Sequence, residues 1–315
     1  MIFSTPLQLV TLSSTKARPL AMGGAYVSIE NGLFALDFNP ATFSFIALEK
    51  KIHFSIYLNP LGPITVVENW NRVSGWDDRL GLLIYGMAFS YDRVGIGILW
   101  GEEVITDQRR LTRSCFFDGT AYPVQKNSNI GFSFFLNPRV SLGAVGEIFH
   151  REKNGKNHIR WGYRYGIVIK PRDDLSVGLC FCNFPNEYKE DRIVLERLAD
   201  ETLNIGVSYS PWKVVMAAFD IRNVSDEGKK VVREPHVGFE VNPVTFMSLR
   251  GGYYREWEGE EETFSVGIGL HSWESEYSAD PVFFNPSLRL DTSMLWQYHL
   301  GEIDRWFLLS CVLKI

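Results

Sequence analysis

Apolar and polar residues alternate along much of the chain from residue 51 onward. The segment TFSVGIGL (263–270) is typical, because a large apolar residue stands at every second position between small ones. A period of two is the pattern of a β-strand with one apolar face, whereas a helix repeats about every 3.6 residues. Fourteen such segments predict strands near 51–60, 80–90, 94–101, 127–137, 140–150, 160–170, 174–184, 201–210, 213–222, 233–241, 245–255, 261–271, 287–299 and 303–315.

A unit of strand, proline turn and strand recurs four times. We expect the prolines to end the first strand and begin the turn, because their fixed φ suits that place. A further short turn is expected at Tyr91-Asp92-Arg93, and longer polar segments lie at 150–158, 185–200, 222–235 and 255–262. Short turns that alternate with long loops are typical of bacterial outer-membrane barrels. The four prolines are Pro138, Pro171, Pro211 and Pro243.

These patterns predict an all-β protein, a transmembrane antiparallel β-barrel of about 14 strands. A closed barrel pairs every backbone group inside the chain, as lipid requires. Charged residues that alternate with apolar ones are expected on the inner face, because Arg or Lys facing lipid near mid-bilayer costs roughly 2–4 kcal/mol. These inner residues are His53, Glu147, Arg164 and Glu240. The last segment, WFLLSCVLKI (306–315), is the terminal strand that such barrels commonly have, although it ends on isoleucine rather than an aromatic residue.

Glycines are frequent in the predicted strands, although glycine weakens a strand. We interpret them as making room on the inner wall for something inside the barrel, and simple accommodation of strand twist is the open alternative. The glycines are Gly95, Gly97, Gly131, Gly143, Gly146, Gly178, Gly206, Gly238, Gly267 and Gly269.

Composition excludes some classes of protein. The net charge is −5, with no Lys/Arg-rich run, so no nucleic-acid partner is expected. No apolar run reaches the roughly 18 residues of a transmembrane helix. The four cysteines, Cys115, Cys180, Cys182 and Cys311, include no CxxC pair. Cys180 and Cys182 would share one strand face and could not easily bond each other, so we interpret them as small apolar fillers.

Motifs that carry enzyme chemistry are missing from the sequence. It holds no phosphate-binding Walker loop, no GxSxG and no HExxH, and its six histidines are scattered without ligand spacing. We therefore expect no catalytic residues, no cofactor and no metal site, and the protein is predicted not to be an enzyme.

The N-terminal stretch carries a family resemblance. ARPLAMGGAYV (17–27), followed by ALDFNPA (35–41), resembles the start of the FadL-type long-chain fatty-acid transporter superfamily, which includes PorV-like outer-membrane proteins. The cluster of small residues and the Asn-Pro-Ala sequence carry the resemblance. Residues 1–17 have no basic stretch before their apolar residues, so we expect that the signal peptide of an exported protein is missing from this chain.

The resemblance implies that residues 1–50 form a plug, or hatch, inside a barrel of residues 51–315. A barrel this wide is not filled by its own wall side chains. Small residues would let the chain pack closely against the wall, and proline and asparagine would fix a turn. The alternative is an arm that caps the periplasmic end without gating. The expected gating residues are Gly23, Gly24, Ala25, Asn39, Pro40 and Ala41.

We therefore expect a monomeric channel or transporter for small hydrophobic compounds in the outer membrane of a Gram-negative-type bacterium. Its partners would be outer-membrane lipid and a hydrophobic small-molecule ligand. One alternative is a PorV-like accessory protein that binds the proteins of a type IX-like secretion system. A second alternative is a soluble all-β binding domain, which would not explain the sorting of the loops.

Overall fold

The computed structural model describes most of the predicted strands and two parts of the N-terminal stretch. The described residues are 9–13, 16–29, 32, 35–43, 52–61, 63, 83–103, 125–153, 156–183, 202–212, 214–224, 233–255, 261–271, 287–299 and 302–314. Among them, no helix is both long and apolar enough to cross a membrane.

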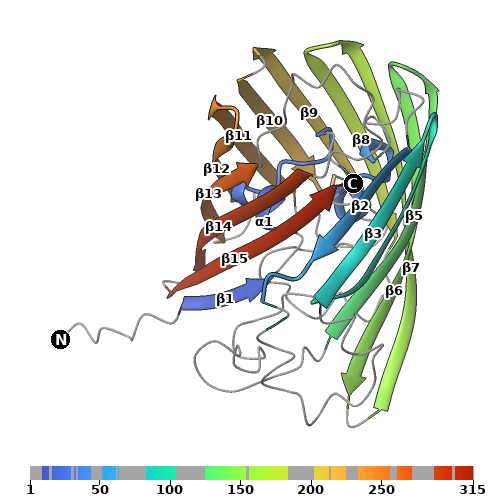
Figure 1. Ribbon diagram of the computed structural model, residues 1–315. Coiled ribbons are helices and arrows are strands. Elements are labelled where there is room, and N and C mark those ends of the chain that lie inside the picture. Colours follow the sequence, from blue (N-terminus) through green and yellow to red (C-terminus); the bar gives the residue numbers. More distant parts are fainter. Residues whose placement is uncertain are drawn as a thin grey trace.

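Fourteen consecutive strands, β2 to β15, form one closed antiparallel barrel in the described part of the chain (Figure 1). Neighbours in sequence pair throughout, and the residues Cys311–Lys314 of β15 close the ring by pairing with Ser55–Leu58 of β2. The predicted barrel and its strand number are confirmed. The strands are Ile52–Leu58, Ile84–Tyr91, Val94–Glu103, Gln125–Asn137, Val140–Lys153, Lys156–Arg172, Leu175–Asn183, Thr202–Trp212, Val215–Arg222, Glu234–Val244, Met247–Arg255, Glu262–His271, Ser287–His299 and Glu302–Lys314.

The period of two places apolar side chains outward and small or polar ones inward. In β13, Phe264, Val266, Ile268 and Leu270 are 46–49% exposed, whereas Ser265 and its inward neighbours are buried. Of the charged residues expected inside, Glu147, Arg164 and Glu240 are buried, and His53 is half-buried. An outward apolar face with an inward polar one is the arrangement that lipid outside the barrel requires.

Three of the four hairpin prolines do not begin the turn, which corrects the prediction. Pro171, Pro211 and Pro243 lie in the last residues of β7, β9 and β11, and turn residues follow at 173–174, 214 and 245–246. Each lies where the strand register shifts. Proline has no N–H to donate, so a bulge is one of the few places in a sheet that accepts it. Only Pro138 lies in its turn, at 138–139.

The predicted alternation of short turns and long loops along the chain holds only in part. The two-residue turns after β3, β5, β7, β9 and β11 share one end of the barrel, but β13 and β14 are joined at that end through 272–286. At the other end, β6 and β7 stay paired as far as Lys153 and Lys156, so most of the predicted loop 150–158 is strand. The two residues between them in the sequence are Asn-Gly, a dipeptide favoured in two-residue hairpins. The polar residues around it made this segment resemble a loop.

A fifteenth strand, β1 (Leu9–Ser13), pairs in parallel with β15, from Leu9 opposite Arg305 to Ser13 opposite Leu309. The sequence pattern did not predict it. It lies along the part of the β15 edge that the short β2 leaves unpaired, so the chain reaches the barrel interior from a strand at its seam. Among the described residues, three short helices follow: α1 (Ala17–Ala21), α2 (Ala35–Phe38) and the 3-10 helix η2 (Pro40–Thr42).

Candidate functional site

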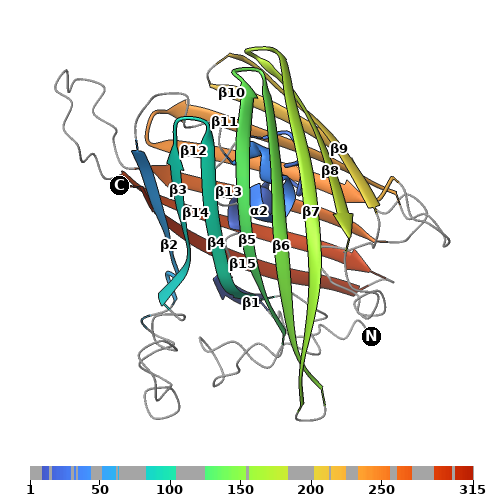
Figure 2. The same ribbon diagram turned by 90° about the vertical axis from the view of Figure 1, so that its right-hand side faces the viewer.

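Residues 16–29 and 35–43, which we call the inner segment, lie against the inner face of the barrel (Figures 1 and 2). Every one of these residues is buried. The helix α1 packs on β12 to β15, whereas η2 packs on β5 to β7, on the other side of the ring. The inner segment therefore bridges two distant parts of the wall.

Two glycines let the inner segment turn immediately after α1. Gly23 and Gly24 have positive φ angles of 61° and 73°, which a residue with a Cβ rarely adopts. Their N–H groups donate to the carbonyls of Leu20 and Pro19 at 3.0 and 2.9 Å, which closes the end of the short helix. The small-residue cluster of the sequence is thus a helix end pressed against the wall.

Asn39 and Pro40 set the second turn. The Asn39 side chain accepts a hydrogen bond from the Ala41 N–H at 3.0 Å, and Pro40 begins η2, where its missing N–H is not needed. The Asn39 amide group also donates to the Val27 carbonyl at 2.8 Å. It lies 3.3 Å from the carbonyl of the wall residue Leu179. One side chain therefore joins both halves of the inner segment to the wall.

The strand glycines make the room that the inner segment occupies. A Cβ at Gly238 would lie 2.5 Å from the Met22 carbonyl oxygen, and one at Gly143 would lie 2.5 Å from the Ala41 nitrogen. Gly166 and Gly252, which sequence reasoning did not single out, also lie against the inner segment. The others that do so are Gly95, Gly131, Gly178, Gly206 and Gly267.

Two predicted glycines have other surroundings. Gly146 has no heavy atom within 4 Å of a Cβ position and is exposed, so it makes no room inside the barrel. Gly269 lies against the side chains of Arg250 and Asp291 of the wall rather than against the inner segment.

Replacing an inward-facing and an outward-facing glycine of the same strand should have different effects on stability. We expect Gly143→Val to lower the free energy of unfolding by about 1–3 kcal/mol, because backbone atoms of the inner segment must move. Gly146→Val on the same strand is the matched control and should change it by about 0.5 kcal/mol or less. Denaturant unfolding in detergent measures both, and equal effects would contradict the proposed difference in packing.

Polar side chains of β10 hold the exposed backbone groups of the inner segment. The Asp220 carboxylate accepts hydrogen bonds from the N–H groups of Tyr26 and Val27 at 2.6 and 2.8 Å. The Arg222 guanidinium donates to the Gly24 carbonyl and lies over the Phe38 ring, 5.0 Å from its centroid. A segment without regular secondary structure needs such partners, because a buried unpaired backbone group costs free energy.

Side chains of β11 and β13 complete these contacts. His236 Nδ1 donates to the Gly23 carbonyl at 2.6 Å, and its ring stacks on Tyr254 at 4.8 Å. The Ser265 hydroxyl accepts from the Gly23 N–H at 3.1 Å and donates to the Ala21 carbonyl at 3.2 Å. Sequence reasoning missed these wall residues, since nothing local marks them as partners of the N-terminal stretch.

A buried charge network joins α1 to β11, β12 and β14. Both oxygens of Glu240 accept from Arg18 at 2.9 Å, and Oε2 also accepts from Arg250 at 2.6 Å. Arg250 continues to Asp291 at 2.8 Å, which also accepts from Arg289 at 2.8 Å. The sequence offered one signal, because Arg18 is the only charged residue between 17 and 29 and a buried arginine needs an acidic partner.

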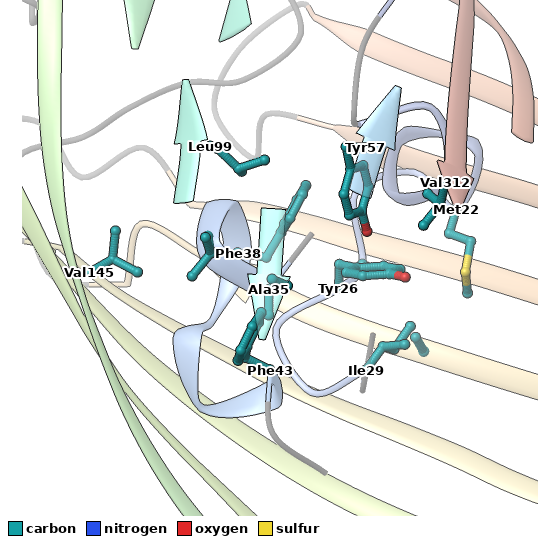
Figure 3. Close-up of a cluster of buried hydrophobic side chains, with 14 residues drawn as sticks. Met22, Tyr26, Ile29, Ala35, Phe38, Phe43, Tyr57, Leu99, Val145 and Val312 are labelled. Atoms are coloured by element: carbon teal, nitrogen blue, oxygen red, sulfur yellow. The ribbon is translucent and has the colours of Figure 1, made fainter. Parts of the chain in front are cut away.

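Apolar side chains fill the space between these polar contacts. Figure 3 shows Tyr26, Phe38 and Phe43 of the inner segment beside wall residues such as Leu99 and Val145. The rings of Tyr26 and Phe38 lie 5.4 Å apart, a separation typical of a favourable aromatic pair. This cluster gives the barrel interior a core that the wall alone does not supply.

The structure places all six residues expected to gate the barrel in the inner segment, in two groups at different parts of the wall. Gly23, Gly24 and Ala25 lie on the α1 side, and Asn39, Pro40 and Ala41 lie on the η2 side, all buried. Their position at the wall is a feature of the structure, whereas gating stays a prediction.

Known proteins resemble this chain in structure. No family model and no curated protein sequence matches it. The toluene transporter TodX of Pseudomonas putida is 12% identical with a TM-score of 0.54, and TbuX of Ralstonia pickettii is 12% identical with a TM-score of 0.50. Each comparison covers 98% of both chains. A Pseudomonas aeruginosa FadL homologue is 13% identical with a TM-score of 0.46, over 97% of this chain and 98% of that one. The chain thus shares the barrel fold of TodX and TbuX.

Proposed function

We propose that this outer-membrane barrel passes small hydrophobic compounds and that the inner segment is the hatch that controls passage. The observation that carries the proposal is a barrel of 14 strands with residues 16–29 and 35–43 buried against its inner wall. A barrel of this size leaves a lumen unless something occupies it. Movement of the inner segment would therefore open a path.

The contacts of the inner segment suit a part that moves. Hydrogen bonds to Asp220, His236 and Ser265 attach its backbone, and the Arg18–Glu240 ion pair attaches its side chain. Water can replace each of these partners when the lumen fills, so opening would not leave charges stranded in an apolar core. Wall glycines opposite the inner segment would also let it slide without side chains in its way.

The class of compound comes from the fold. The structurally similar TodX and TbuX are toluene transporters by their printed names. At 12% identity this likeness supports a hydrophobic compound as the cargo and names none. An accessory role in a type IX-like secretion system, with protein partners in place of a cargo, is the alternative function that an experiment must separate from transport.

Mass spectrometry of the protein extracted from outer membranes in mild detergent tests the proposal. We expect an apolar small molecule at close to one per chain, because a transporter must bind its cargo. An unrelated barrel purified in the same way is the control for adventitious lipid and detergent. A stoichiometric protein partner, with no apolar compound above the control, would instead support the accessory role and contradict transport.

A further inference from the structure

Two thiols stand side by side on the inner face of β8. Cys180 and Cys182 are 0% and 2% exposed, and their sulfur atoms lie 3.8 Å apart. Both are free cysteines. Residues two apart on a strand point to the same face, so the strand itself holds the two sulfurs together. A disulfide would need the sulfurs to approach to about 2.05 Å.

The separation of the sulfurs matches a chelate. With metal–sulfur bonds of about 2.3 Å, two sulfurs 3.8 Å apart subtend an angle of about 111° at the metal, close to tetrahedral. One ion could therefore bridge the thiolates without a change in the strand.

The surroundings of Cys182 favour the thiolate form of this residue over the thiol. Arg164 of β7 stands directly opposite Cys182 in the strand register, and the Asn204 amide of β9 donates to the Cys182 sulfur at 3.6 Å. A cation and an N–H donor both stabilise a negative sulfur. Val27 and Phe149 pack in the same cluster as the cysteines. Apolar neighbours limit the access of water that would compete for the ion.

The donor set selects a class of ion. Within the described ranges, no group of three or more His, Cys, Asp or Glu side chains could hold a metal. A site of two thiolates suits a soft ion that accepts few protein ligands, such as monovalent copper or a thiophilic divalent ion with an exogenous ligand. Hard ions such as Mg²⁺ and Ca²⁺ prefer oxygen and would not bind here.

We propose that Cys180 and Cys182 form a binding site for one thiophilic metal ion on the inner wall of the barrel. The site is separate from the proposed transport function. It lies beside Val27 of the inner segment, so a bound ion would sit where the inner segment meets β8.

Cadmium binding to the full-length protein tests the site. We expect the reduced protein, with Cys115→Ser to remove one further thiol, to retain one Cd²⁺ per chain after dialysis, with a sulfur-to-metal charge-transfer band. Cys180→Ser and Cys182→Ser should each weaken Cd²⁺ binding about tenfold or more, because each removes one of two ligands. Cys311→Ser, which removes the buried thiol of β15, is the matched control and should retain the ion.

Three outcomes would overturn the proposal. They are no retained cadmium, retention unchanged in the Cys180→Ser/Cys182→Ser double variant, and a purified chain two hydrogens lighter that carries a Cys180–Cys182 disulfide. Heat-modifiable gel mobility checks that each variant is a folded barrel. If a folded chain does not bind cadmium, the cause is the lack of a binding site and not a failure to fold.

Discussion

Removal of residues 20–41 should turn the closed barrel into a continuously conducting pore in planar lipid bilayers. The deletion takes out most of the inner segment, including the two glycine and Asn-Pro-Ala turns, and leaves strands β2 to β15 unchanged. A ring of 14 strands is too wide for its own side chains to fill. We expect the ion conductance to rise by about tenfold or more, because the deletion opens an aqueous lumen.

The deleted barrel should still form. Asp220, Arg222 and His236 lose partners, but an open lumen hydrates them, so they are not left as buried unpaired groups. Heat-modifiable gel mobility shows whether the barrel is closed. Gly143→Val, which pushes on the same segment from the wall, should raise conductance to a smaller extent, and Gly146→Val should leave it unchanged. A folded deletion barrel that conducts no more than the full-length chain would refute the hatch.

Glu240→Gln should lower the free energy of unfolding by about 3–5 kcal/mol, the loss expected when one member of a buried ion network is removed. Glu240 accepts hydrogen bonds from Arg18 and Arg250 together. Without the Glu240 carboxylate, Asp291 is the acidic group left in the network for the guanidinium groups of Arg18, Arg250 and Arg289. The measurement is denaturant unfolding followed by tryptophan fluorescence.

An exposed ion pair in the same barrel supplies the control. Arg255 and Glu262 lie 3.4 Å apart with side chains 52% and 36% exposed, so Glu262→Gln should change stability by about 1 kcal/mol or less. Arg18→Met should have a smaller effect than Glu240→Gln, because Glu240 then keeps Arg250 as its partner. If the two glutamate variants unfold alike, the network is not holding the inner segment to the wall.

Much of the barrel could be predicted because lipid leaves a local mark on each strand. An outward face that meets hydrocarbon must be apolar, so Phe264 to Leu270 alternate with small residues whatever the rest of the chain does. The strands β13 (262–271) and β14 (287–299) lie within one residue of the predicted ranges, 261–271 and 287–299. The Asn-Pro-Ala turn could likewise be predicted, because its hydrogen bond is local. The Asn39 side chain accepts this bond from the N–H of Ala41, two residues further along the chain.

Other features depend on partners far along the chain, and no local pattern carries them. Arg18 meets Glu240 across 222 positions, and Asp220 meets Tyr26 across 194. The parallel pairing of β1 with β15 likewise places Leu9 opposite Arg305.

The sequence by itself therefore determined most strands of the barrel and which of their faces is apolar and points outward, because these choices depend on the surroundings of single residues. Only the tertiary structure decided which wall residues hold the inner segment and which charges pair. Those choices depend on strand register, and register joins residues that are distant in the chain.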